Sequence, residues 1–135
     1  MNIGETGIKG ENKVCRYLMM RGYKILDRNF QCRFGEIDII AKKKEYIVFV
    51  EVKTRKSGGM TTPADALTPV KKKRLFRAAA AWLTKYDAWS YPCRFDLACV
   101  TFSHGMYQTE LISNVIEFGE FRNSFSGGNT AWQPW

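Results

Sequence analysis

The sequence contains few of the residues that build transition-metal and redox sites. Its 135 residues include a single histidine, His104, and four cysteines that form no Cys-x-x-Cys pair. Zinc centres are built mainly from closely spaced cysteine and histidine, so none is expected here. The cysteines, at positions 15, 32, 93 and 99, lie among apolar or strand-like residues. We expect them to be reduced thiols in or near the core, and any metal to be held by carboxylates.

Long apolar runs are also missing. No segment approaches the ~20 apolar residues of a membrane span, and residues 1–5 contain no apolar stretch of the signal-peptide type. The sequence therefore predicts a cytoplasmic protein without a membrane partner.

Acidic residues are outnumbered, with 13 Asp and Glu against 21 Lys and Arg and a net charge of +8. This balance favours an anionic partner, of which nucleic acid is the commonest. With 45% hydrophobic and 14% aromatic residues, the chain should be globular. We expect one domain at residues 1–117 and a Gly-, Ser- and aromatic-rich tail at 118–135, whose rings either stack on bases or pack on the body.

The most informative stretch comprises residues 35–55. Two apolar runs, 37–41 and 46–52, flank the polar residues 42–45, which predicts a β-hairpin with a four-residue loop. With an even loop length, opposite positions sum to an odd number, and one face becomes wholly apolar. That face holds Ile37, Ile39, Ala41, Tyr46, Val48, Val50 and Val52.

The other face of this hairpin carries charges at its open end, namely Glu36, Asp38, Glu51 and Lys53. Charged groups rarely enter a buried face without a partner or a metal. Asp38 and Glu51 supply the one or two carboxylates that Mg²⁺ needs, with the Val52 carbonyl as a third oxygen. Lys53 would orient an attacking water or offset charge in the transition state. A cross-strand salt bridge between Lys53 and either acid is the structural alternative.

These residues also carry a family resemblance. The run Gly35-Glu36-Ile37-Asp38, followed by Phe49-Val50-Glu51-Val52-Lys53-Thr54-Arg55, resembles the PD-(D/E)xK nuclease signature in the form seen in the YraN family of uncharacterised bacterial proteins. Ile37 stands where the name-giving proline would be. The similarity spans residues 7 to about 116 and includes Gly10-Glu11, Gly22-Tyr23, Arg28-Asn29, Lys71 and Arg94-Phe95-Asp96.

The YraN family in turn resembles archaeal Holliday junction resolvases. The resemblance implies a restriction-endonuclease-like α/β fold, Mg²⁺ or Mn²⁺ as the cofactor, and DNA as the substrate, with branched DNA as a candidate. It is also compatible with a homodimer, because related resolvases act as dimers. A non-catalytic nucleic-acid-binding protein on the same scaffold is the alternative function.

Glu11 is the third candidate acid. Apolar residues recur at helical spacing over residues 6–21, Gly22 should end the helix, and Glu11 lies within the apolar stripe. Either it caps a backbone group or pairs with Arg28 or Arg94, or it joins the metal site. The resemblance favours a place for Glu11 in the metal site, because related nucleases carry a glutamate on their first helix.

A second helix should begin at Thr68-Pro69 and run to about Tyr86. Cations in its first turn oppose the helix dipole, which suggests a counter-charge from the acidic site or a bound phosphate. A solvated basic face is the alternative. The resemblance favours Lys71 as the functional lysine, whereas the helical wheel favours Lys72. The predicted nucleic-acid contacts are Arg55, Lys56, Lys71, Lys72 and Arg74.

The remaining segments complete a mixed sheet. We predict a short strand at 23–26, a turn at 27–29, a strand from 30 that leads into the hairpin, and a second hairpin at 94–102 and 106–112. Asp96 either reaches the acidic site or pairs with Arg94. The order α, β, β, β, α, β, β predicts an α/β domain with a mixed sheet flanked by helices.

Overall fold

A computed structural model describes residues 3–56 and 66–116. The elements are α1 (Ile3–Met20), β1 (Lys24–Cys32), β2 (Gly35–Lys43), β3 (Tyr46–Lys56), α3 (Pro69–Lys85), β4 (Cys93–Ser103) and β5 (Met106–Ile112). The predicted tail lies outside the described residues.

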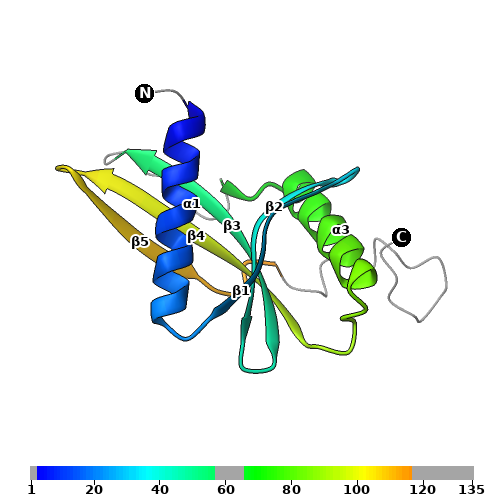
Figure 1. Ribbon diagram of the computed structural model, residues 1–135. Helices are drawn as coiled ribbons and strands as arrows, with labels where there is room; N and C mark the ends of the chain where they lie inside the picture. Colours follow the sequence, from blue (N-terminus) through cyan, green and yellow to red (C-terminus); the bar gives the residue numbers. More distant parts are fainter. Residues whose placement is uncertain (1–2, 57–65, 117–135) are drawn as a thin grey trace.

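The strands form one mixed sheet in the order β1-β2-β3-β4-β5. Neighbours are antiparallel except β3 and β4, which are parallel and are connected through α3. The two helices cover opposite faces of the sheet (Figure 1). This α/β arrangement is consistent with a restriction-endonuclease-like fold, so the predicted fold class is confirmed.

Each face of the sheet has its own core. The cluster under α1 joins Val14, Cys15 and Leu18 to Ile39, Ala41, Val48, Val50, Ala98 and Val100. The cluster under α3 joins Leu75, Phe76, Ala79, Trp82 and Leu83 of the helix to Ile37, Ile40, Ile47, Phe49, Phe95 and Leu97 of the sheet. The central strands are thus buried on both sides, which explains their nearly continuous apolar sequence.

The hairpin differs from the prediction in two respects. Its loop has two residues, Lys44 and Glu45, so the pairing shifts by two residues relative to the predicted one while the even loop length is kept. Ile37, however, belongs to the core under α3, so the side-chain alternation of β2 breaks between Ile37 and Ile39. The prediction that Ile37 shares a face with Ile39 is therefore wrong. Tyr46 is 41% exposed rather than buried.

β1 is one continuous strand, so the predicted turn at residues 27–29 is wrong. Asn29 adopts a positive φ of 51° inside the strand, and the β1–β2 register shifts between Ile25 and Asp27. The turn lies instead at Arg33-Phe34. The turn-forming residues 27–29 instead form an irregularity within β1, because the strand continues to pair with β2 on both sides of them.

The helix ends follow the predicted signals. Gly22 has a φ of 85° just beyond α1, and the Lys43 ammonium donates to the Arg21 carbonyl there. Thr68 caps α3, with Pro69 as its first residue. The cysteines are free thiols, as predicted. Among the described residues, neither helix is both long and apolar enough to cross a membrane.

Candidate active site

The site lies where the β2–β3 ladder ends. The last paired residues are Ile39 and Val50. One step further along both strands, the same register brings Asp38 opposite Glu51. There the Val52 N–H donates a 2.8 Å hydrogen bond to Asp38 Oδ2. A side chain thus replaces backbone pairing at this point and fixes the Asp38 carboxylate against β3.

Asp38 and Glu51 form a directly interacting pair of carboxyl groups. Their side chains are hydrogen-bonded to each other, which two ionised carboxylates cannot be. Burial raises the pKa of Glu51 to about 8, and the charge of Asp38 contributes to that rise. Burial also raises the pKa of Asp38, although the Val52 N–H opposes this shift. At neutral pH these shifts favour one bound proton on the pair as a whole.

The apolar surroundings of Glu51 explain its large shift. Its side chain is 16% exposed, and it borders a small cavity whose lining includes Ile37, Leu67 and Leu75. A carboxylate in such a setting loses its hydration without gaining enough hydrogen bonds to compensate. Protonation or a bound cation relieves that cost.

Lys71 is the cation that reaches the pair. Its Nζ lies 3.9 Å from Glu51 Oε1. The lysine is held at the start of α3, where its N–H donates to Thr68 Oγ1 at 3.2 Å. Its charge lowers the pKa of Glu51 and of Asp38, but burial raises both by more. Of the two lysines left open by the sequence, Lys71 is the one in an ion pair with Glu51.

α1 brings Glu11 to the same end of the sheet. A Cβ on Gly10 would overlap Thr54 Oγ1, so the absence of a side chain lets the helix approach β3 closely. Glu11 is half-buried, and its pKa is raised. Burial is the largest cause, and the charge of Asp38 is the next. Arg28 opposes this shift. Glu11 therefore lies in the electrostatic field of the acid pair and of Arg28 together.

Two residues outside the predicted set belong to this acidic cluster. Because carboxylates only accept hydrogen bonds, the Asn29 amide nitrogen must face them, and it lies 2.7 Å from Glu11 Oε1 and 3.2 Å from Glu36 Oε1. The charge of Glu36 contributes to the raised pKa of both Glu11 and Asp38. The sequence carried a signal for each of these two residues. Glu36 stands two residues before Asp38, and asparagine is one of the residues that tolerate a positive φ.

Lys53 and Arg55 follow Glu51 along β3. Both are half-buried, and strand alternation places them on the same side as Glu51. Within the described residues, Glu51 forms its ion pair with Lys71 and not with Lys53. Arg55 Nη2 lies 4.0 Å from Cys99 Sγ on the neighbouring strand. The β3 face beyond the acid pair is thus basic.

The other predicted nucleic-acid contacts lie on or next to these elements. Lys72 is half-buried and Arg74 is exposed on α3. Lys56 is the last residue of β3, and its side chain lies outside the described part of the structure.

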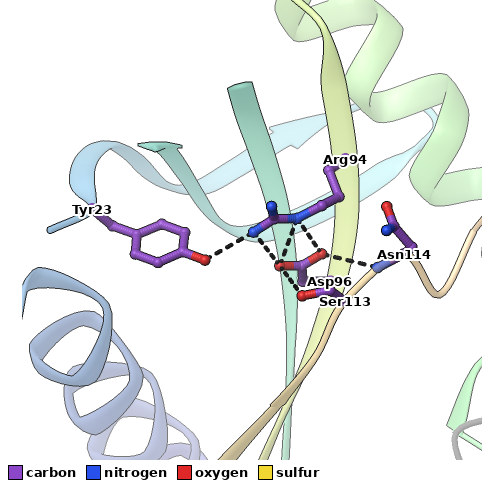
Figure 2. Close-up of polar contacts among 5 residues, drawn as sticks. All are labelled: Tyr23, Arg94, Asp96, Ser113 and Asn114. Atoms are coloured by element: carbon purple, nitrogen blue, oxygen red, sulfur yellow. Dashed lines mark hydrogen bonds and ion pairs between the residues drawn. The ribbon is translucent and has the colours of Figure 1, made fainter. Parts of the chain in front are cut away.

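Asp96 does not join the acid pair. It is 1% exposed and forms a two-point ion pair with Arg94, whose Nε lies 3.0 Å from Asp96 Oδ1 and whose Nη2 lies 3.0 Å from Oδ2. Figure 2 shows that Tyr23, Ser113 and Asn114 complete a closed network around them. The interpretation of Asp96 as an ion-pair partner is confirmed.

The side chains available at this site determine which metal ions it could bind. In the described residues, no group of three or more His, Cys, Asp or Glu side chains is placed to hold an ion. A pair of buried carboxylates suits Mg²⁺ or Mn²⁺, because these ions use few protein ligands and complete their shells with water and phosphate. Asp38 and Glu51 fit that requirement, whereas an all-protein Ca²⁺ or Zn²⁺ cage is not formed there.

Comparison with known proteins places the chain among bacterial relatives. The family model described as "Uncharacterised protein family UPF0102" matches residues 10–100. A UPF0102 protein of Nitratidesulfovibrio vulgaris is 45% identical over 130 residues, covering 96% of this chain and 95% of the relative. One from Geobacter metallireducens is 48% identical, covering 82% and 91%, respectively. A third, from Lawsonia intracellularis, is 38% identical over 97% of both chains.

Proposed function

We propose that this chain, which belongs to the uncharacterised protein family UPF0102, is a metal-dependent nuclease that hydrolyses phosphodiester bonds in DNA. The observation that carries the proposal is the buried pair of Asp38 and Glu51, which the Val52 N–H orients at the end of the β2–β3 ladder and whose pKa values burial raises. Pairing two acids in an apolar setting disfavours folding, and strongly perturbed acids of this kind are typical of functional sites.

In this proposal, Asp38 and Glu51 hold one Mg²⁺ or Mn²⁺ ion. Once bound, the ion would polarise the scissile phosphate and acidify a coordinated water. The Val52 N–H keeps the Asp38 carboxylate oriented before any ion arrives. Preorganisation of this kind reduces the reorganisation that the protein must undergo during the reaction.

The cations around the pair have separate roles. Lys71, 3.9 Å from Glu51, balances the charge of the acid pair before the phosphate is bound. Lys53, on the same side of β3 as Glu51, would orient the attacking water or offset charge that develops on the phosphate. Glu11 and Glu36 extend the negative field and favour cation entry.

The choice of DNA rests on charge and on the family resemblance. The net charge of +8 and the basic residues of α3 and β3 favour a polyanion. Branched DNA is the first substrate to test, because the signature resembles that of junction resolvases. Cytoplasmic location and assembly as a homodimer remain parts of this proposal.

The test is cleavage of labelled linear and branched DNA with Mg²⁺ or Mn²⁺. Asp38→Asn is the sharpest variant, because the amide keeps an acceptor for the Val52 N–H while removing the charge. We expect Asp38→Asn and Glu51→Gln to lose at least about 100-fold in rate, as removal of a key electrostatic group does. Lys44→Gln, an exposed cation in the hairpin loop, is the matched control. Cleavage that persists unchanged in Asp38→Asn would refute the proposal.

A non-catalytic nucleic-acid-binding protein is the second candidate. It is favoured by the net charge of +8 and the basic residues of α3, which binding requires whether or not a strand is cut. In that case DNA binding would weaken steeply with salt while no strand is cut with any divalent ion. A chain that binds no DNA at low salt would exclude both functions.

A further inference from the structure

The β1–β2 turn packs against α3. The two turn residues are Arg33 and Phe34, and the next residue, Gly35, lies against the helix, where an added Cβ would be 3.7 Å from Arg74 Cβ. The hairpin tip and the exposed side of the helix thus form one continuous surface.

Two arginines from these two elements converge on a single ring. The guanidinium carbon of Arg33 lies 4.9 Å from the centre of the Phe34 ring, and that of Arg77 lies 5.7 Å from it. A guanidinium over an aromatic face is attracted to the ring, and an exposed one such as Arg33 can still donate to another acceptor. Arg33 is exposed, whereas Phe34 and Arg77 are half-buried. The Phe34 ring therefore holds two positively charged groups close together at the edge of this surface.

These arginines lie at the far end of a row of cations on α3 that begins with Lys71, next to the acid pair. Lys71, Arg74 and Arg77 are three residues apart on α3, and side chains at this spacing are neighbours on a helix. At about 1.5 Å per residue, the row covers about 9 Å of the helix axis. This length corresponds to between two and three nucleotides of rise, at about 3.4 Å each along one strand.

No acidic residue interrupts this row. α3 contains Lys71, Lys72, Lys73, Arg74, Arg77 and Lys85, and no Asp or Glu. Like charges at helical spacing repel, and cations in the first turn oppose the dipole. A polyanion bound along the row would offset both the repulsion between the cations and their unfavourable interaction with the helix dipole.

We infer that Arg33, Phe34 and Arg77 form a second phosphate-contact point for DNA, which receives the strand after it has passed the acid pair and Lys71. The inference rests on the proposed function, since it defines how a nuclease substrate lies on the protein. Phe34 acts as the support that orients both guanidinium groups. The contact is to backbone phosphate, so it is independent of base sequence.

The test uses the Asp38→Asn protein, which binds without cutting, and measures anisotropy of a labelled DNA duplex at several salt concentrations without metal. The double variant Arg33→Gln/Arg77→Gln removes both guanidinium groups. We expect the slope of log affinity against log salt to become shallower by about 1 to 2, because each phosphate contact contributes about 0.9. Phe34→Leu, which keeps both charges but removes the ring, should lose part of the same slope.

The matched control is Lys44→Gln/Lys85→Gln. It removes the same number of charges, and Lys85 also lies on α3 over aromatic rings, 5.9 Å from the centre of Phe30 and 5.4 Å from that of Tyr86, but in the last turn. A slope that changes equally in the control and in the arginine variant overturns the inference and leaves the nuclease proposal standing. The single variant Arg33→Gln, at an exposed position, guards against misfolding and should itself lower the slope. Absence of any binding by the parent protein overturns both.

Discussion

Two buried carboxylate sites of this protein lie in the same sheet and are built in opposite ways. Asp96 on β4 is 1% exposed, yet Arg94, Ser113 and the Asn114 N–H satisfy both its oxygens (Figure 2). Asp38 on β2 faces another acid, Glu51 on β3, and burial raises the pKa of both. The difference separates a carboxylate that stabilises the fold from a pair of carboxylates that the fold disfavours.

Burial alone therefore does not identify the functional acid. Asp96 is the more deeply buried residue, but an arginine fork compensates its charge completely. Glu51 is less buried, and the charge of Lys71 at 3.9 Å lowers its pKa by less than burial raises it. What distinguishes the candidate site is a pair of buried carboxyl groups whose burial the protein compensates only in part.

Asp96→Ala should produce the largest loss of stability. It leaves the half-buried Arg94 without its carboxylate and should lower the free energy of unfolding by about 3 kcal/mol, as breaking a buried ion pair does. Urea denaturation measures this effect. Asp38→Asn is the comparison and should lose less than about 1 kcal/mol. If the two variants lose the same amount, the distinction between the two sites fails.

Gly10→Ala should have the next largest effect, because it pushes α1 and Glu11 away from β3. The new methyl group would overlap Thr54 Oγ1 and should cost about 1 to 2 kcal/mol of unfolding free energy, even though alanine favours helix. The double variant Gly10→Ala/Thr54→Ala should recover most of this loss. An equal loss in both backgrounds would show that helix approach does not depend on this contact.

The acid pair should make the protein less stable as pH rises. The pKa of Glu51 is 4.5 when unperturbed and about 8 in the fold. Between these values the folded state keeps a proton that the unfolded state has lost, so the free energy of unfolding falls with increasing pH. The slope should approach about 1.4 kcal/mol per pH unit.

Thermal or urea unfolding from pH 5 to 9 measures this slope. Glu51→Gln, which cannot ionise, should flatten it, whereas Asp87→Asn, at an exposed acid beyond α3, should leave it unchanged. A slope of the same size in Glu51→Gln would assign the pH dependence to other groups.

The sequence predicted those features that depend on local pattern. Thr68-Pro69 marked the start of α3, and the even loop length placed Asp38 and Glu51 on one side of the hairpin, although the loop itself proved two residues shorter. Both results follow from backbone geometry that short segments determine on their own. The prediction that both acids lie at the open end of one hairpin therefore needed no knowledge of the tertiary structure, whereas their exact register did.

The features that sequence could not predict depend on contacts between elements. The alternation of β2 breaks at Asp38, because its side chain binds the Val52 N–H in place of the ladder, and this moves Ile37 to the other core. The bridge that Asn29 forms between two acids requires a positive φ inside a strand. Simple periodicity assumes regular strands, and the site is located where regularity ends.

The central claim is that a divalent cation replaces the proton shared by Asp38 and Glu51. Calorimetric titration with Mn²⁺ at pH 7, in two buffers that differ in ionisation enthalpy, measures both the binding and the protons released. The account predicts one bound ion that displaces close to one proton in the natural protein, and no binding to Asp38→Asn or Glu51→Gln. Mn²⁺ binding that survives in both variants, or binding that releases no proton, would contradict it.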